Sequence, residues 1–159
     1  MNFSIEPLSD KYRNCVKERT NEVFGGTFVV SRGVSHEPAS LPGFIALSGK
    51  ELVGLATYHF ANNECELVTI DALIQGRAVG SRLLRVVEEV AMASNCQRLW
   101  LITTNDNLDA LRFYEKCGYH VKQVYAGAVA KSRIIKPSIP EIGNYGIPIR
   151  DEIELEKLI

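Results

Sequence analysis

The sequence predicts a single α+β domain over residues 1–159, in which helices pack on one mostly antiparallel sheet. Two observations support this prediction. The first half of the chain alternates short apolar strands with turn residues, which is typical of an antiparallel meander. The second half alternates dense apolar runs with segments whose apolar residues recur every three or four positions, which is typical of helices. A length of 159 residues suits one domain.

Composition and charge narrow the class of protein. Hydrophobic residues make up 46% of the chain and charged residues 23%, as in soluble globular proteins. A net charge of −1 supplies no basic field for nucleic acid or a membrane surface. No apolar run approaches the ~18 residues of a membrane span, and the N-terminus lacks the pattern of a signal peptide. We therefore expect a cytoplasmic protein with no nucleic-acid or membrane partner.

The four cysteines are widely spaced and form no CxxC pair: Cys15, Cys65, Cys96 and Cys117. We expect reduced thiols that pack as small hydrophobic side chains. The spacing of these cysteines and of the three histidines matches no metal-ligand pattern, so we expect no metal site.

The first elements are a strand and a helix. Phe3 and Ile5 alternate with polar residues, and Pro7 weakens or ends the strand. The next segment has helical spacing, with Asp10 as a plausible N-cap and Gly25-Gly26 as the stop. Residues 27–42 carry many Gly, Ser and Pro residues, which predicts a long irregular loop of the kind that often serves function.

A hairpin and a third strand follow. The apolar runs 44–47 and 52–58 flank Ser48-Gly49-Lys50-Glu51, and this pattern predicts a hairpin. Asn62-Asn63 predicts another turn, after which residues 65–72 continue the meander. If that strand is regular, Glu64, Glu66, Val68 and Ile70 share one face, although a bulge would change which face each meets.

The remaining elements follow from apolar runs and helical spacing. We expect a helix over about 79–94, a buried strand at 99–102, a helix around 108–117 ended by Gly118, a strand at 119–124, a short helix within 126–135 and a final strand within 150–158.

The turn between residues 75 and 81 carries the clearest functional signal. Gly76 and Gly80 permit close backbone approach, and the helix that starts near Val79 presents unpaired N–H groups to an anion. Arg77 can add a charge-assisted contact. These features suit a pyrophosphate, although the same residues also suit a turn with no ligand. The spacing is neither that of a Walker loop nor that of a GxGxxG fingerprint.

Two blocks resemble a known family. The segment Gln75-Gly76-Arg77-Ala78-Val79-Gly80 resembles the Q/R-x-x-G-x-G/A signature of the GNAT superfamily of acyl-CoA-dependent N-acyltransferases. The segment from Asn107 to Tyr119 resembles the family's N-x-x-A-x-x-F/L-Y-x-x-x-G-F/Y block. The likeness covers roughly residues 1–125, with the blocks in the family's order.

The resemblance implies an α/β/α sandwich with a six- to seven-stranded sheet and a splayed central strand pair. It also implies acetyl-CoA as co-substrate, held by the strand, by the turn and by the second block. The implied cofactor-binding residues are Thr69, Ile70, Gln75, Gly76, Arg77, Ala78, Val79, Gly80, Ser81, Asn107 and Tyr114. Asn107 is equally a candidate helix cap. Ala78 replaces a glycine of the signature, and a methyl group there is tolerable if the residue stays right-handed.

The resemblance places Tyr114 at the family's general acid, although a buried aromatic is the alternative. Glu64 or Glu66 is a candidate general base, or each is only a solvated carboxylate. These residues imply direct acetyl transfer to a primary amine of a small molecule or peptide. The alternative is a module that senses acyl-CoA with little turnover. The charged segment 150–154 is expected at the acceptor pocket or at the edge of a homodimer.

Overall fold

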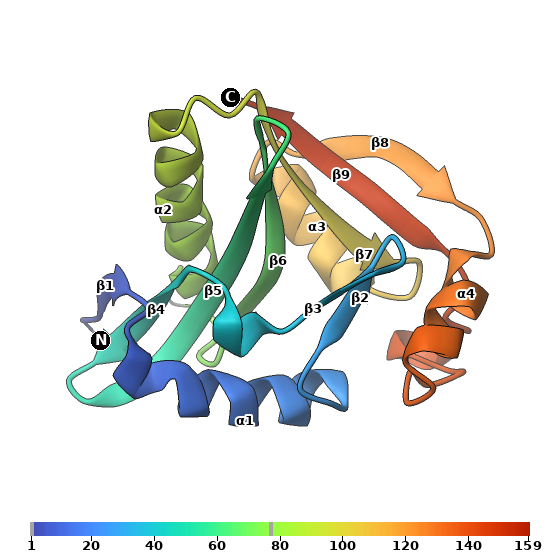
Figure 1. Cartoon of the computed structure of the whole chain (residues 1–159), viewed down its shortest axis with the longest axis horizontal. Coiled ribbons are helices and arrows are strands. Elements are labelled where there is room, and N and C mark those ends of the chain that lie inside the picture. The colour runs from blue at the N-terminus through green and yellow to red at the C-terminus, as the bar shows by residue number, and fades with distance from the viewer. Residues whose placement is uncertain (1, 77) are drawn as a thin grey trace.

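A seven-stranded sheet runs through the computed structural model, which describes residues 2–76 and 78–159 (Figure 1). Its strands lie in the order β1-β4-β5-β6-β7-β9-β8, and β6–β7 is the parallel pair in an otherwise antiparallel sheet. The strands are β1 (Ser4–Pro7), β4 (Gly43–Ser48), β5 (Glu51–Ala61), β6 (Glu64–Ala72), β7 (Arg98–Thr104), β8 (His120–Tyr125) and β9 (Glu152–Leu158). A separate hairpin pairs β2 (Val29–Ser31) with β3 (Val34–His36).

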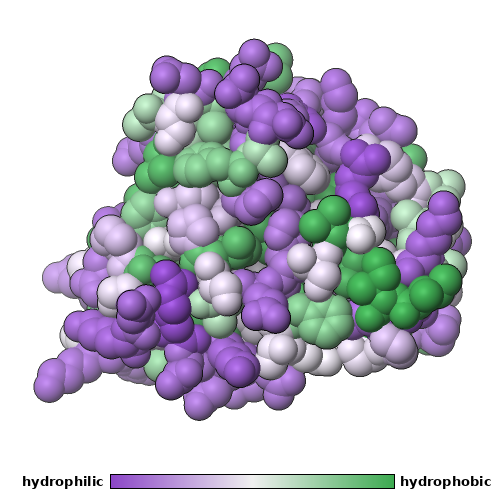
Figure 2. All heavy atoms as spheres, viewed as in Figure 1, coloured by the Kyte–Doolittle hydropathy of each residue, from purple (hydrophilic) through white to green (hydrophobic). Residues whose placement is uncertain are grey.

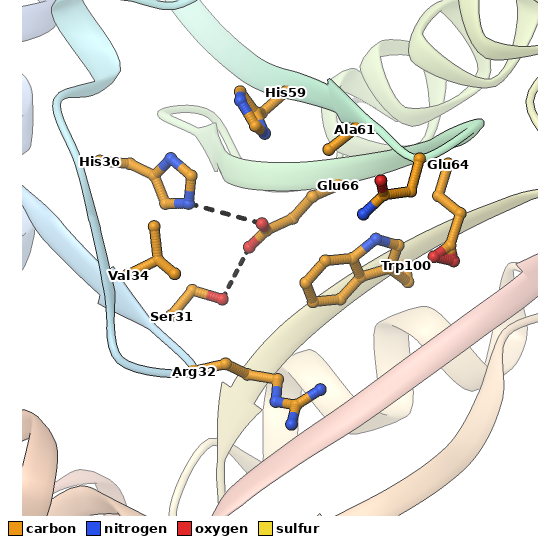
Figure 3. Close-up of a pocket in the computed structure, with 10 residues that line it drawn as sticks. Ser31, Arg32, Val34, His36, His59, Ala61, Glu64, Glu66 and Trp100 are labelled. Carbon is orange, nitrogen blue, oxygen red and sulfur yellow. Dashed lines mark hydrogen bonds and ion pairs between the residues drawn. The ribbon is translucent and has the colours of Figure 1, made fainter.

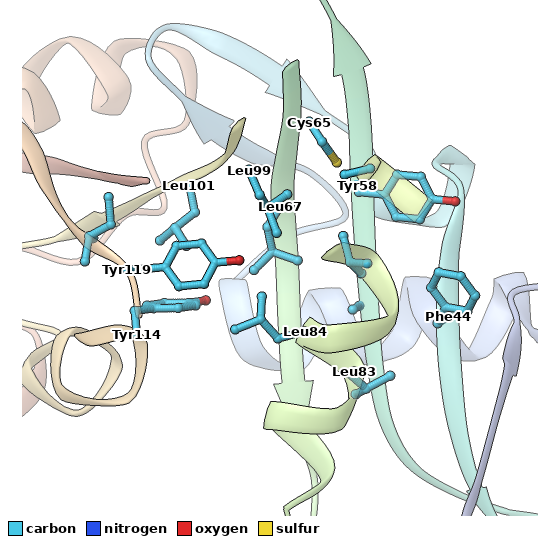
Figure 4. Close-up of a cluster of buried hydrophobic side chains, with 14 of the residues drawn as sticks. Phe44, Tyr58, Cys65, Leu67, Leu83, Leu84, Leu99, Leu101, Tyr114 and Tyr119 are labelled. Atoms are coloured by element: carbon cyan, nitrogen blue, oxygen red, sulfur yellow. The ribbon is translucent and has the colours of Figure 1, made fainter. Parts of the chain in front are cut away.

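Four helices complete the fold: α1 (Arg13–Phe24), α2 (Val79–Ala93), α3 (Leu108–Lys116) and α4 (Ala128–Ile135). Helix α1 packs on β4 and β5 through a small apolar cluster that includes Val16 and Ile45. Helices α2 and α3 cover the opposite face with a larger cluster, shown in part in Figure 4. The predicted α/β/α sandwich with a seven-stranded sheet is confirmed.

Helix α2 lies close against β5 because Gly54 has no side chain. A Cβ built on Gly54 would lie 2.6 Å from Val79 Cγ1 and 3.0 Å from Leu83 Cδ1. Both of these α2 side chains are fully buried. This contact fixes the first turn of α2 against the centre of the sheet.

A bulge changes the faces of β6. Thr57 pairs with Thr69 but Tyr58 pairs with Leu67, so Val68 is the extra residue. As a result, Ile70 packs with Leu67 in the α2–α3 cluster. The expectation that Val68 and Ile70 share a face with Glu64 and Glu66 is therefore wrong beyond the bulge.

Strands β6 and β7 separate soon after they pair. Their register covers only Cys65 with Leu99 and Glu66 with Trp100, although β6 continues to Ala72 and β7 to Thr104 (Figure 1). This divergence is the predicted splayed pair. It leaves the β7-facing edge of β6 without a strand partner beyond Glu66, as far as the described residues show.

Two local predictions fail in the N-terminal half. Residues 27–42 are not wholly irregular, because they contain the β2–β3 hairpin and a 3-10 turn at Pro38–Ser40. Asp10 does not cap α1: it opens a 3-10 turn and accepts a 3.0 Å hydrogen bond from Arg13 Nε. Gly25 ends α1 in a left-handed conformation, as predicted. The short helix and final strand of the C-terminal third are confirmed as α4 and β9.

The hairpin lies over the same face of the sheet as α1 and is held from the side by α4. Lys136, just after α4, donates from Nζ to the carbonyl oxygens of Phe24 (2.5 Å) and Phe28 (2.7 Å). On this face the surface is a mosaic, with hydrophobic side chains gathered over the region of the hairpin and α4 (Figure 2). Among the described residues, no helix has the length and apolar character that crossing a membrane requires.

Candidate functional site

The turn before α2 has the backbone of an anion cradle. Gly76 and Ala78 both have left-handed dihedral angles, with φ of 73° and 58°. Ala78 is the N-cap residue of α2 and is left-handed, so the condition under which a methyl group is readily tolerated there is not met. In the left-handed conformation the Cβ of alanine makes an unfavourable steric contact that glycine avoids. Arg77 lies outside the described residues.

The first amides of α2 point out of the helix end. The first helical hydrogen bond runs from Arg82 N to Ala78 O (3.1 Å), so the N–H groups of Val79, Gly80 and Ser81 precede the ladder. A Cβ on Gly80 would lie 3.4 Å from Phe113 Cζ, which shows how closely α2 approaches α3. Together with exposed Gln75, these residues fit a phosphate group at the helix N-terminus.

The strand leading into the turn engages its side chains elsewhere. The Thr69 hydroxyl is buried and lies 2.6 Å from the Thr57 hydroxyl, and Ile70 packs into the core. Beyond Glu66, where β6 separates from β7, the described residues leave the main-chain groups on this edge of β6 for a ligand. Main-chain pairing with an extended ligand is the role that the resemblance implies for these two residues.

Helix α3 carries the second sequence block. Asn107 Oδ1 accepts a hydrogen bond from Ala110 N (3.3 Å), so Asn107 caps α3, as the alternative interpretation held. Tyr114 is buried, and its ring packs edge-on against Phe113 and Tyr119 at centroid distances of 5.1 and 5.9 Å (Figure 4). Burial raises the pKa of Tyr114, which keeps its phenol protonated.

Tyr119 and its partners close the α2–α3 face behind Tyr114. The Tyr119 hydroxyl donates to Glu88 Oε2 at 2.6 Å, and Lys157 Nζ lies 3.4 Å from both oxygens of Glu88. This ion pair offsets the negative charge of Glu88 next to Tyr119. The surroundings of Tyr114 are therefore apolar and aromatic.

The opposite face of the sheet holds a pocket of about 190 Å³ between the hairpin and strands β5, β6 and β7 (Figure 3). Its lining consists of Ser31, Arg32, Val34, His36, His59, Ala61, Asn62, Glu64, Glu66 and Trp100. The volume suits a small group rather than a large ligand. Two predicted base candidates, Glu64 and Glu66, lie in this lining.

Glu66 is the buried acid of the pocket. Its carboxylate accepts a hydrogen bond from Ser31 Oγ (2.7 Å), and its other oxygen lies 3.5 Å from His36 Nε2 (Figure 3). Burial raises the pKa of Glu66, and the nearby Glu154 and Glu152 add to this effect against the hydrogen bond from Ser31. A carboxylate of this kind is suited to accept a proton near neutral pH.

Glu64 has a different environment. Arg98 Nε donates to Glu64 at 2.6 Å, while Arg98 Nη1 binds Glu154 and Glu156 at 2.6 and 2.9 Å. Glu64 therefore belongs to a charge network that β6, β7 and β9 share. Its negative charge is already paired, unlike that of Glu66.

Sequence reasoning missed several residues of this pocket. Ser31 and His36 come from the loop at 27–42, which the sequence predicts to serve function, but the stretch has no periodicity that singles out either residue. Arg98 and Trp100 alternate with the apolar residues of β7, and the glutamates of β9 alternate with Ile153 and Leu155. A glutamate at every second position of a buried strand is a signal that could have been found.

The cysteines do not form a nucleophilic centre. Burial raises the pKa of Cys65 to about 12 and also raises the pKa of Cys117. Neither thiol is therefore activated for attack. Residues 2–76 and 78–159 contain no cluster of His, Cys, Asp and Glu suited to hold a metal ion.

Known proteins resemble this chain over most of its length. The model of the GNAT acetyltransferase family matches residues 9–119. The protein YdhI of Bacillus subtilis (strain 168) is 45% identical over 120 residues, which cover 75% of each chain. Two solved acetyltransferases share the fold over 99% of each chain with TM-scores of 0.69: one from Bacillus subtilis in complex with CoA (18% identical) and one GNAT family member from Elizabethkingia anophelis with acetyl-CoA bound (19% identical). The chain belongs to the GNAT family of acetyltransferases.

Proposed function

We propose that the protein transfers an acetyl group from acetyl-CoA directly to a primary amine, within a ternary complex. One observation carries the proposal: Glu66 is the last residue of β6 that pairs with β7 before the strands separate. A thioester that lies along the free edge of β6 beyond this residue would meet the pocket at its acidic end. The cofactor side and the acceptor side thus converge at Glu66.

The cofactor assignment follows the free backbone groups. Thr69 and Ile70 would pair with the pantetheine arm through their main chain. Gln75 to Ser81 would enclose the pyrophosphate, with the α2 amides and Arg77 as donors. Asn107 would contact the pantetheine arm while its side chain caps α3. The two left-handed residues and the α2 amides that precede the first helical hydrogen bond among the described residues support this assignment.

Glu66 is the better candidate for the general base. Its carboxylate is buried, and burial together with the nearby Glu154 and Glu152 raises its pKa, whereas Glu64 is bound to Arg98. An amine that enters as an ammonium ion would lose one proton to Glu66 before it attacks the thioester. A pocket of about 190 Å³ can hold a small amine or the tip of a peptide as the reacting part of the acceptor.

Tyr114 would protonate the departing sulfur. A thiol has a pKa of around 8.5, so the leaving thiolate needs only modest help from an acid. A buried phenol that stays protonated can give this help. The aromatic packing of Tyr114 would hold the ring in place during the transfer.

The first experiment separates binding from turnover. Acetyl-CoA at 100 times its dissociation constant should stabilise the fold by about 2.7 kcal/mol, measured as an increase in melting temperature. Thiol release from acetyl-CoA is then followed with polyamines, amino acids, aminoglycosides and peptides. Stabilisation without thiol release for any amine would favour an acyl-CoA sensor. The absence of stabilisation at millimolar acetyl-CoA would contradict both functions.

A further inference from the structure

Two histidines lead from Glu66 to the molecular surface. His36 is 8% exposed, and its Nε2 faces a Glu66 oxygen at 3.5 Å. The His36 ring lies 5.3 Å from the ring of His59, centroid to centroid, and His59 is exposed. Figure 3 shows the three side chains grouped on one side of the pocket, with the second ring nitrogen of His36 on the side away from Glu66, and His59 stands opposite Glu66 in the β5–β6 register. The carboxylate, the buried imidazole and the exposed imidazole thus come from β6, β3 and β5.

We propose that His36 and His59 form a proton exit from the acceptor pocket, through which Glu66 returns to its ionised state after each turnover. This proposal rests on the proposed function, because it assumes that Glu66 accepts the amine's proton. His36 acts through Glu66 and touches no reacting atom, so it is a positioning and relay residue. His59 is the contact with solvent.

The proton balance requires an exit. An ammonium acceptor and a thioester become an amide, a free thiol and one proton. Glu66 removes the first proton from nitrogen, which leaves the lone pair that attacks the carbonyl carbon. As the carbon–sulfur bond breaks, Tyr114 gives its proton to sulfur, and the second proton lost by nitrogen replaces it. The proton on Glu66 is the net product, and it must leave a carboxyl group that is 6% exposed.

The other groups around Glu66 are poor outlets. Ser31 donates its hydroxyl hydrogen to Glu66, and Glu64 and Glu154 are held by Arg98. The remaining charged or titratable groups are Arg32 from the hairpin, Glu152 bound to the Ser132 hydroxyl, and Glu156 bound to Arg98. His36 is the neutral base within reach, because burial lowers its pKa and keeps the imidazole unprotonated at neutral pH.

The distance of 3.5 Å between His36 Nε2 and Glu66 is longer than a hydrogen bond. Catalytic contacts of this kind often tighten only when substrate is bound. In the relay, the carboxyl proton passes to His36 Nε2, and the imidazolium releases its other proton toward His59 and water. After a full cycle every protein group has its starting protonation state, and the net proton has passed to the solvent.

The test compares His36→Gln with His120→Gln, which changes an exposed histidine on β8 outside the pocket. With the best acceptor amine, His36→Gln should lower kcat roughly tenfold or more at pH 7, while the KM for acetyl-CoA stays the same. The defect should shrink as the pH approaches about 10, where the amine enters without its extra proton. Added imidazole should restore the rate, and His59→Gln should cause a smaller loss. A kcat defect that is equal at all pH values and insensitive to imidazole would overturn the relay.

A second measurement needs no turnover. The His36 imidazole is titrated by NMR in the wild type and in Glu66→Gln. If the two groups exchange a proton, loss of the carboxylate should lower the His36 pKa further, and His120→Gln should leave it unchanged. Identical His36 titrations in the wild type and Glu66→Gln would overturn the proposal even if acetyl transfer is observed. A wild type that acetylates no amine but shows the coupling would contradict only the proposed function.

Discussion

The α2–α3 face of the sheet buries leucines, valines and three tyrosines, whereas the face beneath the β2–β3 hairpin buries glutamates and a histidine around the half-buried Arg98. The first face is close-packed and apolar, which stabilises the fold. The second face keeps Glu66 buried without an ion pair to Lys or Arg among the described residues, a state that costs free energy. Strands β6 and β7 separate beyond Glu66 and Trp100, which line the pocket. The difference suits the first face to hold the protein together and the second to the proton transfer that we propose for Glu66.

Of the substitutions considered, Glu66→Gln on the charged face should cause the largest loss of turnover. Loss of a general base lowers kcat about 10²- to 10⁴-fold, equivalent to about 2.7–5.4 kcal/mol in the barrier. The fold should persist, because glutamine can still accept the hydrogen bond from Ser31. Steady-state kinetics with acetyl-CoA and an amine measure the loss. A greater loss for Glu64→Gln than for Glu66→Gln would show that the base is assigned to the wrong carboxylate.

Leu83→Ala should show the opposite pattern on the apolar face. Leu83 is fully buried between α2 and Gly54, so truncation should destabilise the fold by about 2–5 kcal/mol. Urea unfolding gives this value. The kcat of the folded fraction should change only a few-fold, since Leu83 lies away from the pocket. A large kcat defect in fully folded Leu83→Ala would mean that the two faces are not separable.

Tyr114→Phe tests the one residue of the apolar face that we assign to chemistry. Removal of the phenol should lower kcat roughly tenfold to a hundredfold, because a thiolate leaves with little help. Acetyl-CoA binding and the melting temperature should change little, since the ring is retained. Tyr119→Phe is the matched variant: it loses the hydrogen bond to Glu88 and should cost stability rather than turnover. Equal turnover in wild type and Tyr114→Phe would remove Tyr114 from the mechanism.

The apolar face could be predicted from the sequence, and most of the charged face could not. Val79, Leu83 and Val87 recur at helical spacing, and the run at 99–102 is dense enough for a buried strand. Apolar residues recur at this spacing because one side of the helix or strand is buried against the rest of the protein. Ser31 and His36 meet Glu66 only through tertiary folding, and the bulge at Val68 has no local signature. The left-handed Ala78 also escaped prediction, because that conformation is set by the helix start it caps.

The turn at residues 75–81 belongs to neither face, and Ala78→Gly tests its proposed role in binding acetyl-CoA. Glycine relieves the left-handed strain of about 1–2 kcal/mol but adds freedom to the unfolded chain, which offsets about 0.5–1 kcal/mol. The variant should therefore be slightly more stable, and it should bind acetyl-CoA as well or better. Gly76→Ala, at a φ of 73°, should change stability in the opposite direction. Weaker acetyl-CoA binding in Ala78→Gly, measured by calorimetry, would argue against the assigned position of the pyrophosphate.

The smallest expected effect is the pH dependence of stability that Glu66 causes. Its pKa is raised in the folded state, so the native protein holds this proton more tightly than the unfolded chain does. Glu66 therefore lowers stability as the pH rises from the unfolded pKa of about 4.3 through the folded pKa. Buried His36 acts in the opposite sense, because its lowered pKa makes stability fall on acidification below about 6.5. In Glu66→Gln the contribution of the Glu66 carboxylate is absent, while those of His36 and the other shifted groups, such as Glu154, remain. The melting temperature of the variant relative to the wild type should rise between about pH 4 and about pH 8. A constant difference over that range would mean that Glu66 is not the destabilised carboxylate of the charged face.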